Sequence, residues 1–470
     1  MHETRRRVAG IALLILIYFA IVFLIPKPAV VKPEGWRLFG LFVTAVAGLL
    51  IEPIPGGALV LVAITLSAII GGLTVQGALA GYSDPTVWLV MSAFFISRAL
   101  LNTGLARRIA LIFVRHFGSN STGICYALAF SDMTLATVIP SNGARTGGVV
   151  LPIIRSIAEL YGSKPGETAR LIGSYLMMGV YQCSCISCAM FFTGQASNPL
   201  IARLAGGAGF KITWLSWLLA GIVPGGLAVL LTPLIVRRMY APGIHHTPEA
   251  AAFAASELKG MGPMSRSERI LTAIFLGVCG MWITSDIHKV DITATALLGC
   301  SALLLTGVLK WEDVRSEKGA WDLFFWYGGL VMLGRALNDT KVPQEFANGV
   351  AAMFGGLGWP VLLGTAVVIY FYAHYAFASI TAHVLAMFPP FMAVLLAKQA
   401  PIGLVVLAFA CFANLSAGLT HYGTTPAPMF YAQNYVTLRD WWRIGFVISL
   451  MNLVVWGVAG VAWWKVIGIW

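Results

Sequence analysis

The chain has 470 residues, 58% of them hydrophobic and only 11% charged, with a mean hydropathy of +0.82. Because a soluble domain carries about 25% charged residues, this composition excludes an ordinary soluble protein and indicates one embedded in a lipid bilayer. The formal net charge of +12 does not indicate a nucleic-acid partner, since the basic residues are distributed as expected for the two sides of a membrane.

Apolar runs long enough to cross a membrane, about 20 residues each, recur along the whole chain. We therefore expect an all-α polytopic membrane protein with eleven transmembrane helices. The first run follows MHETRRR, but no small-residue cleavage site of a signal peptide precedes Pro26, so residues 1–35 are expected to form a retained N-terminal transmembrane helix. The spans are predicted at 8–25, 36–52, 57–80, 86–104, 170–195, 213–236, 270–287, 292–309, 321–337, 402–420 and 443–464.

The basic residues orient these spans. With the N-terminus in the cytoplasm and the C-terminus outside, about twice as many Lys and Arg residues fall on the cytoplasmic side as on the other, as the positive-inside rule requires. This predicts a multi-pass protein of the cell (inner) membrane. Arg98, Arg145 and Arg335 remain at membrane depth.

Two long apolar segments fall outside the spans, at 121–156 and 360–398. Each is interrupted by small polar residues, in PSNGARTGG and in ASITAHVLAMFPP, so each is predicted to be a re-entrant hairpin. Two spans are also interrupted, near 193–200 (TGQASNPL) and near 421–428 (HYGTTPAP). Broken backbone at membrane depth is tolerated only where protein or a water-filled cavity satisfies it.

The two halves of the chain resemble each other. FISRALLNTG matches MLGRALNDTK, PSNGARTGGVVLP aligns with ASITAHVLAMFPP, and TGQASNPL aligns with YGTTPAPM, in the same order and at nearly constant spacing. An odd number of crossings separates the copies, which predicts an inverted-topology repeat of the kind that builds secondary transporters. We place the first repeat at 36–240, a cytoplasmic linker at 241–269 and the second repeat at 270–470.

Each break starts a new half-helix, whose free N–H groups and dipole favour anions. Four such starts that converge would suit a small molecule with a carboxylate at each end. The alternative is that these Ser and Thr hydroxyls simply bond to their own helices. The candidate residues are Ser141, Asn142 and Gly143; Ser379 and Thr381; Gly194, Gln195, Ser197 and Asn198; and Gly423, Thr424 and Thr425.

The hairpin alignment pairs Arg145 with His383, two side chains that can carry positive charge. An arginine at the bilayer centre costs at least ~2.5 kcal/mol unless it finds a partner, and we expect an anionic substrate in that role. Alternatives are that Arg145 reaches the cytoplasmic surface or pairs with Asp132, that His383 is a neutral core histidine, and that Asp132 titrates in a proton-coupled cycle. Arg98 and Arg335 are expected to be structural, and His421 is a weaker candidate.

No chemistry beyond binding is indicated. Cys183, Cys185 and Cys188 lie in an apolar helix without His or carboxylate neighbours, so no metal site is expected there. A Ser/His/Asp arrangement, a Gly-rich nucleotide loop and an HExxH motif do not stand out. We therefore expect neither an enzyme nor a cofactor, and we favour a carrier over an anion channel.

Three stretches, PSNGARTGG, ASITAHVLAMFPPF and LTHYGTTPAPMFYAQNYV with Trp441 and Trp442 after it, resemble the divalent anion/sodium symporter family. The similarity is to its exchanger branch, which holds bacterial citrate/succinate and tartrate/succinate antiporters and the plastid 2-oxoglutarate/malate translocator. It extends over nearly the whole chain and implies a homodimer with scaffold and transport domains that works as an elevator. The family has a Ser-Asn-Thr-like triplet at each hairpin tip, in which Gly143 here replaces a threonine and Ile380 replaces the amide.

In the sodium-coupled branch of that family, Na⁺ ions at the tips help to neutralise the carboxylates. A fixed cation beside the tip would repel Na⁺ by about 4 kcal/mol at 4 Å and an effective dielectric of 20. Arg145 and His383 are therefore expected to replace the ions, and an empty carrier with this exposed charge would not cross. The prediction is sodium-independent exchange of di- or tricarboxylates of the succinate, malate, 2-oxoglutarate, citrate or tartrate type, and the alternative is a Na⁺-coupled dicarboxylate symporter.

Overall fold

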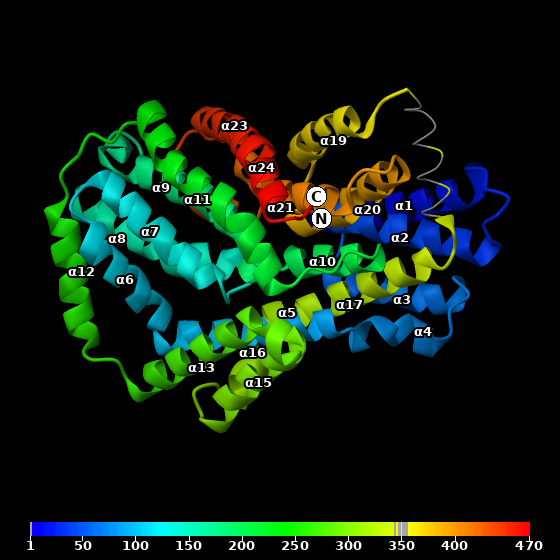
Figure 1. Cartoon of the computed structure of the whole chain (residues 1–470), viewed down its shortest axis with the longest axis horizontal. Coiled ribbons are helices and arrows are strands. Elements are labelled where there is room, and N and C mark those ends of the chain that lie inside the picture. Colours follow the sequence, from blue (N-terminus) through cyan, green and yellow to red (C-terminus); the bar gives the residue numbers. More distant parts are fainter. Residues whose placement is uncertain (1, 343–344, 346–348, 350–355) are drawn as a thin grey trace. The chain divides into compact units, whose positions relative to one another are not determined.

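The computed structural model describes residues 2–342, 345, 349 and 356–470, and this part of the chain is almost entirely helical (Figure 1). Within it, eight helices are long and apolar enough to cross a membrane. The protein is therefore a multi-pass membrane protein. The eight are Thr4–Leu24, Pro33–Ile51, Pro85–Thr103, Trp214–Met239, Trp359–Ala376, Ile380–Ala397, Ile402–Leu419 and Leu438–Val466.

The predicted spans agree with this set in part. Each predicted span contains a helix, but the span predicted at 57–80 is wrong in length, because its helix, Gly56–Ile69, ends before Gly72, whose φ of 77° is left-handed. Two of the eight helices, Trp359–Ala376 and Ile380–Ala397, are the arms of the segment predicted as the second hairpin. At 18 residues each, both arms are about 27 Å long, close to the thickness of the hydrocarbon core, so the re-entrant path stays a prediction.

The chain forms two compact units. The first comprises Met1–Met91, Arg315–Ala366 and Thr381–Pro401. Its helix α17 packs against α2, α3, α4 and η2. The elements here are α1 (His2–Phe19), η1 (Ala20–Leu24), α2 (Pro33–Ile51), α3 (Gly56–Ile69), α4 (Val75–Leu79), η2 (Ala80–Ser83), α17 (Lys318–Asn338) and most of α20 (Ile380–Ala397).

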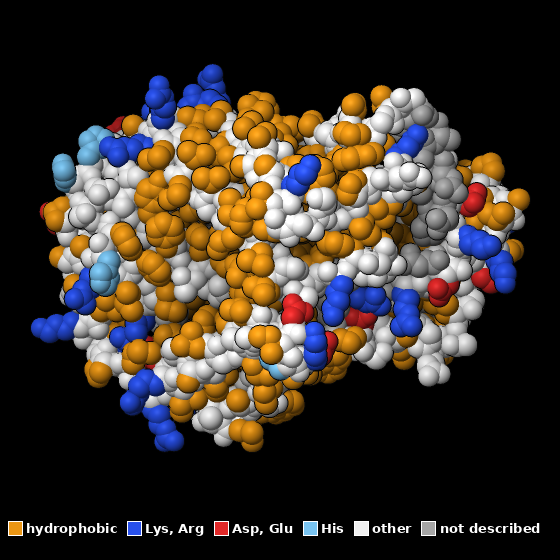
Figure 2. Space-filling model, in the orientation of Figure 1, with side chains coloured by type: hydrophobic (Ala, Val, Ile, Leu, Met, Phe, Trp, Pro, Cys, Tyr) orange, Lys and Arg blue, Asp and Glu red, His pale blue; other side chains and the backbone are white. Residues whose placement is uncertain are grey.

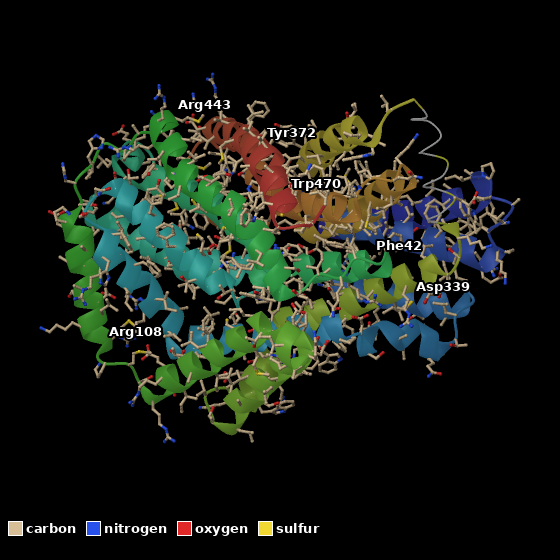
Figure 3. All side chains as sticks on the ribbon, viewed as in Figure 1. Phe42, Arg108, Asp339, Tyr372, Arg443 and Trp470 are labelled. Carbon is tan, nitrogen blue, oxygen red and sulfur yellow. The ribbon has the colours of Figure 1, made fainter. Side chains whose placement is uncertain are left out.

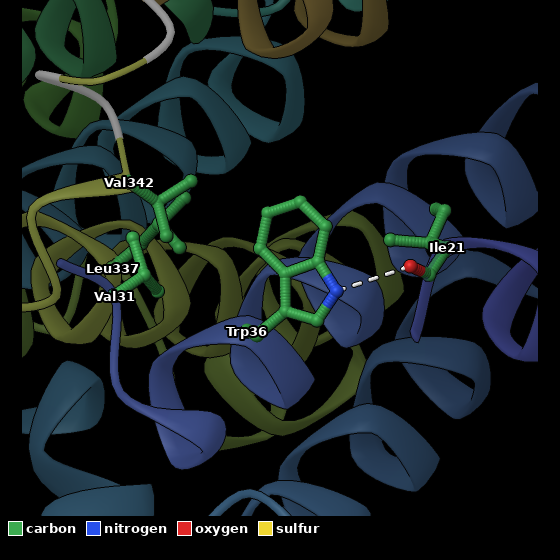
Figure 4. Packing of buried hydrophobic residues seen from close by; sticks show 5 residues of the cluster. All are labelled: Ile21, Val31, Trp36, Leu337 and Val342. Atoms are coloured by element: carbon green, nitrogen blue, oxygen red, sulfur yellow. Dashed lines mark hydrogen bonds between the residues drawn. The ribbon is translucent and has the colours of Figure 1, made fainter. Parts of the chain in front are cut away.

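A small apolar cluster lies between η1, α2 and the end of α17 in this first unit. The buried side chains of Ile21, Val31, Trp36, Leu337 and Val342 pack together there (Figure 4). The Trp36 indole Nε1 donates a hydrogen bond to the Ile21 carbonyl at 3.1 Å, so the ring is buried without leaving its N–H unpaired. The cluster joins the end of η1 to the end of α17.

The second unit comprises Ser92–Val314, Val367–Ile380 and Ile402–Trp470. Its centre is α9, all 18 residues of which are buried beneath α7, α11 and α21. Its side chains are mostly apolar or small, as expected for a helix in such an interior position. The earlier elements are α6 (Leu105–Phe117), α7 (Ser121–Ala136), η3 (Gly143–Val150), α8 (Leu151–Leu160), η4 (Ala169–Leu171), α9 (Gly173–Met190), η5 (Phe192–Gly194), α10 (Ser197–Gly207), α11 (Trp214–Met239) and α12 (Pro248–Met261).

The remaining elements of this unit follow in chain order. They are α13 (Arg266–Ile283), α14 (Ser285–His288), α15 (Ile292–Leu305), η6 (His374–Ala376), α21 (Ile402–Leu415), η7 (Ser416–Leu419), α22 (Pro426–Tyr431), α23 (Leu438–Val454), η8 (Val455–Gly460) and α24 (Val461–Val466). Among the described elements, four helices cross from one unit to the other along the chain: α5 (Pro85–Thr103), α16 (Trp311–Ser316), α19 (Trp359–Ala373) and α20, whose first residue belongs to the second unit.

Apolar side chains also cover much of the outer surface (Figure 2). On α11, Leu219, Leu227, Leu230 and Leu234 are each at least 42% exposed, although the opposite face of the helix packs on α9. Exposed leucine along a helix of membrane-spanning length is the pattern of a lipid-facing surface. This agrees with the multi-pass assignment.

The predicted linker, 241–269, is helical over Pro248–Met261, and α12 runs alongside α6 (Figure 1). Arg108 on α6 (Figure 3) forms a bidentate ion pair with Glu268 at the start of α13: Nε donates to Oε1 at 2.6 Å and Nη2 to Oε2 at 3.2 Å. Burial acts to raise the pKa of Glu268, but the hydrogen bonds from Arg108 and from the Ser265 N–H outweigh it, and the pKa lies below its usual value. This pair fastens the linker to the second unit.

Candidate functional site

All four predicted breaks are interruptions of helices in the structure. The first hairpin is α7, a non-helical turn at 137–141 and the η3–α8 helix. The helix α9 ends at Met190, and α10 begins at Ser197. In the second half, 377–379 separates η6 from α20, and 420–425 separates η7 from α22. These positions follow from sequence, because Gly, Pro and short polar side chains interrupt otherwise apolar helices there.

The tip of the first hairpin is fastened to the break before α22. Ser141 caps the new helix, its Oγ accepting from the Ala144 N–H at 3.2 Å. The buried Asn142 donates from Nδ2 to Thr424 Oγ1 at 2.8 Å. Gly143 packs on Thr425 so closely that a Cβ at position 143 would lie 2.7 Å from Thr425 Cγ2. The glycine at this position therefore allows the tip to approach α22.

Arg145 has its ion-pair partner within the protein. Its side chain is completely buried, and Nε lies 2.7 Å from Asp132 Oδ1, so the structure shows the ion pair that was left open as an alternative. Nη1 donates to the carbonyls of Ile139 and Gly194 at 2.9 and 3.0 Å. Through these bonds the guanidinium links the hairpin tip to the break after α9, and the expected contact between Arg145 and substrate stays a prediction.

Asp132 is likewise fixed within this network. Its Oδ1 also accepts from Thr146 Oγ1 at 2.9 Å, one residue beyond Arg145. The carboxylate is fully buried and lies against the Arg145 guanidinium. The alternative in which Asp132 titrates in a proton-coupled cycle stays a prediction.

The break after α9 is organised around Asn198. Its Nδ2 donates to the carbonyls of Cys188 and Phe191 at 2.8 and 2.9 Å, two groups that the end of α9 leaves without helical partners. Gln195 Oε1 accepts from the Ala196 N–H. Ser197 Oγ is buried and has no hydrogen-bond partner among the described residues. Among the described residues of this break, Ser197 thus has a hydroxyl that is available to bind a ligand.

The break before α22 carries Gly423, Thr424 and Thr425. The buried His374 donates from Nε2 to the Gly423 carbonyl at 2.9 Å, which joins the first arm of the second hairpin segment to this break. His374 was missed by sequence reasoning, although a histidine at the end of the apolar run FYAHYAF could have identified it. His421, the weaker candidate, accepts from Trp442 Nε1 at 3.2 Å.

Only part of the predicted set is brought together. Asn142, Gly143, Thr424 and Thr425 are in direct contact. Ser379 is half-buried and belongs to the second unit, whereas Thr381, half-buried, and His383, fully buried, belong to the first. That these three join the other candidates, and that His383 faces Arg145, therefore stay predictions.

The arginines expected to be structural differ in burial. Arg98 is half-buried, and Arg335 is exposed at a cavity of about 560 Å³ in the first unit. Lys32, Glu34 and Asp339 also line this cavity. Among the described residues no group of three or more His, Cys, Asp or Glu side chains could hold a metal ion.

Comparison with known proteins adds a family. The model described as "Sodium:sulfate symporter transmembrane region" matches residues 7–470. The chain is 40% identical to dicarboxylate transporter 1, chloroplastic, of Spinacia oleracea, over 96% of this chain and 80% of that one. It is 35% identical to inner membrane protein YbhI of Escherichia coli over 97% of both chains. It is 32% identical to the L-tartrate/succinate antiporter of Shigella flexneri, over 95% of this chain and 96% of that one.

Proposed function

This chain belongs to the sodium:sulfate symporter family, and from that premise we propose that it is a secondary transporter of di- or tricarboxylates that exchanges one for another without sodium. Relatives named as a dicarboxylate transporter and as a tartrate/succinate antiporter support the substrate class. Succinate, malate, 2-oxoglutarate, citrate and tartrate are the candidates. We assign substrate binding to Ser141, Asn142, Gly143, Arg145, Asn198, Ser379, Thr381, His383, Gly423, Thr424 and Thr425.

One observation carries the sodium-independent reading. In transporters with broken helices, carbonyl oxygens of unwound backbone coordinate Na⁺. Here two carbonyls of that kind, those of Ile139 and Gly194, already accept hydrogen bonds from the buried Arg145 guanidinium. A permanent cation thus occupies the carbonyl oxygens that a sodium ion at this hairpin would need.

The charge balance modifies the exchange mechanism. Because Asp132 offsets Arg145, the pair adds little net charge to the empty carrier. The positive charge that would keep an empty carrier from crossing then depends on His383 and on the helix starts at the breaks. Substrate carboxylates would neutralise these groups, which favours crossing in the loaded state.

The remaining features of the mechanism are part of the proposal. We infer an elevator in which a transport domain carries the substrate past a scaffold domain, an inverted-topology repeat with two re-entrant hairpins, and a homodimer. The N-terminus lies in the cytoplasm and the C-terminus outside. The excess of Lys and Arg on the cytoplasmic side supports this orientation.

Sodium-coupled symport is the second candidate, and a specific observation favours it. Three buried oxygens at the two broken helices, Ser197 Oγ, Asn414 Oδ1 and Thr420 Oγ1, have no hydrogen-bond partner among the described residues. Hydroxyl and amide oxygens are suitable ligands for a hard cation. A sodium site that avoids Arg145 would use these atoms.

Purified protein in liposomes distinguishes the two candidates. Vesicles preloaded with unlabelled succinate should take up labelled succinate with choline as the only external monovalent cation, and empty vesicles should not. Uptake into empty vesicles that requires an inward Na⁺ gradient would instead establish symport. Malate, 2-oxoglutarate, citrate and tartrate as competitors then rank the substrates.

A further inference from the structure

Side chains from one half of the chain hold the broken helix of the other half. On α9, Tyr181 OH donates to the Ala417 carbonyl and Gln182 Nε2 to the Gly418 carbonyl, both at 2.8 Å. Ala417 and Gly418 lie in η7, where α21 gives way to the break before α22. Carbonyls at a helix end lack intrahelical partners, so these two bonds satisfy groups that the break would otherwise leave open.

The reverse support comes from Asn414 on α21. Its Nδ2 donates to Asn198 Oδ1 at 2.8 Å and to the Ala410 carbonyl at 3.0 Å. Asn198 in turn donates to Cys188 and Phe191 at the end of α9. Both amide side chains are fully buried, where a polar group left without a hydrogen-bond partner is costly.

The chemistry fixes the orientation of both amides. The Asn198 NH₂ group must face the two carbonyls of α9, because a flipped amide would set its oxygen against them. Its Oδ1 therefore faces α21, where the Asn414 amide donates to it. The Asn414 bond thus selects the rotamer that holds the start of α10 in place.

We propose that Asn414 is a positioning residue for the substrate site, which acts through Asn198 and fixes the start of α10 relative to the break before α22. The inference rests on the proposed transport function, because the two breaks are assigned there as the carboxylate-binding elements. A site held in place before substrate arrives binds more tightly than one that must be ordered by the substrate. Loss of the Asn414 amide should therefore weaken binding more than it slows the transport cycle.

The test measures succinate counterflow in liposomes for Asn414→Leu, which keeps the size of the side chain and removes the donor, and for Asn414→Ala. Both should raise KM about three- to tenfold, as expected for one hydrogen bond, and change the maximal rate less than twofold. Asn452→Leu is the matched control, because Asn452 is also buried in this unit and its Oδ1 has no partner among the described residues. Its KM should equal that of the unchanged protein.

A double variant separates positioning from general packing. If Asn414 acts through Asn198, then Asn414→Leu should not raise KM further once Asn198→Ala is present. An unchanged KM in both Asn414 variants, or full additivity in the double variant, overturns the inference. Absence of exchange by the unchanged protein would instead refute the proposed function. Thermal midpoints in detergent identify any variant that fails to fold. If Asn414→Leu does not fold, the KM of Asn414→Ala provides the test.

Discussion

Arg145 Nε and Asp132 Oδ1 lie 2.7 Å apart, and both side chains are completely buried. Thirteen residues separate them in the chain, and the turn at the hairpin tip brings them together. The same guanidinium holds the Ile139 and Gly194 carbonyls, so one side chain joins α7, the hairpin tip and the break after α9. An arginine that looked isolated in the sequence is the centre of a polar network.

Arg145→Ala should lose succinate exchange in the absence of sodium. The change leaves the Asp132 carboxylate buried without its partner, which should lower the free energy of unfolding by about 3 to 5 kcal/mol. It also leaves one carboxylate and two carbonyls facing a space that a cation can fill. Added Na⁺, but not choline, should therefore restore part of the exchange and raise the thermal midpoint.

The matched variant combines Arg145→Ala with Asp132→Asn. Without the carboxylate the buried charge is gone, so the thermal midpoint should recover relative to Arg145→Ala and Na⁺ should no longer stimulate exchange. Normal sodium-free exchange by Arg145→Ala would contradict the proposal that exchange depends on this network.

Gly143→Thr should impair exchange although it restores the threonine of the family triplet. A Cβ at position 143 would lie 2.7 Å from Thr425 Cγ2, so the hairpin tip or α22 has to move. Overpacking of this kind typically costs about 1 to 3 kcal/mol. Thr425→Ser removes the clashing methyl group and keeps the hydroxyl, so the double variant should recover exchange if the close contact is the cause.

Thr424→Val should raise the KM for succinate about fivefold, because the isosteric change removes the acceptor of the Asn142 hydrogen bond. The buried Asn142 amide is then left without this partner at the hairpin tip. Thr232→Val is a control of the same chemistry: Thr232 is buried, and its hydroxyl bonds only to the Ala228 carbonyl of its own helix within the described structure. Equal KM values in the two variants would contradict the role of Thr424.

Glu268 should make stability depend on pH. Because its folded-state pKa lies below the usual value of 4.5, its contribution to stability is present above that value and is lost as the pH falls through the lowered folded pKa. The thermal midpoint in detergent should therefore decrease as the pH is lowered below about 4.5. Glu268→Gln should lower the midpoint at pH 7 and flatten this acid limb, while succinate exchange at its remaining activity keeps the same KM.

Much of the fold was readable from sequence because apolar length and interruption are local properties. About 20 apolar residues cross a bilayer, and Gly, Pro, Ser and Asn break helices wherever they stand. The breaks at PSNGA, TGQAS, FASIT and HYGTT were located in this way. The end of the third predicted span was not located correctly, because the left-handed Gly72 that follows its helix stands among apolar residues.

Sequence by itself thus determined a multi-pass helical membrane protein, four interrupted helices and a family. Only the tertiary structure decided the partners of the buried polar groups: Arg145 with Asp132, Asn142 with Thr424, and Asn198 with Asn414. Each of these bonds needs atoms aligned within about 3 Å, and two of them join residues more than two hundred positions apart. The order of residues along a chain does not contain that geometry, because it arises when helices from both halves pack against one another.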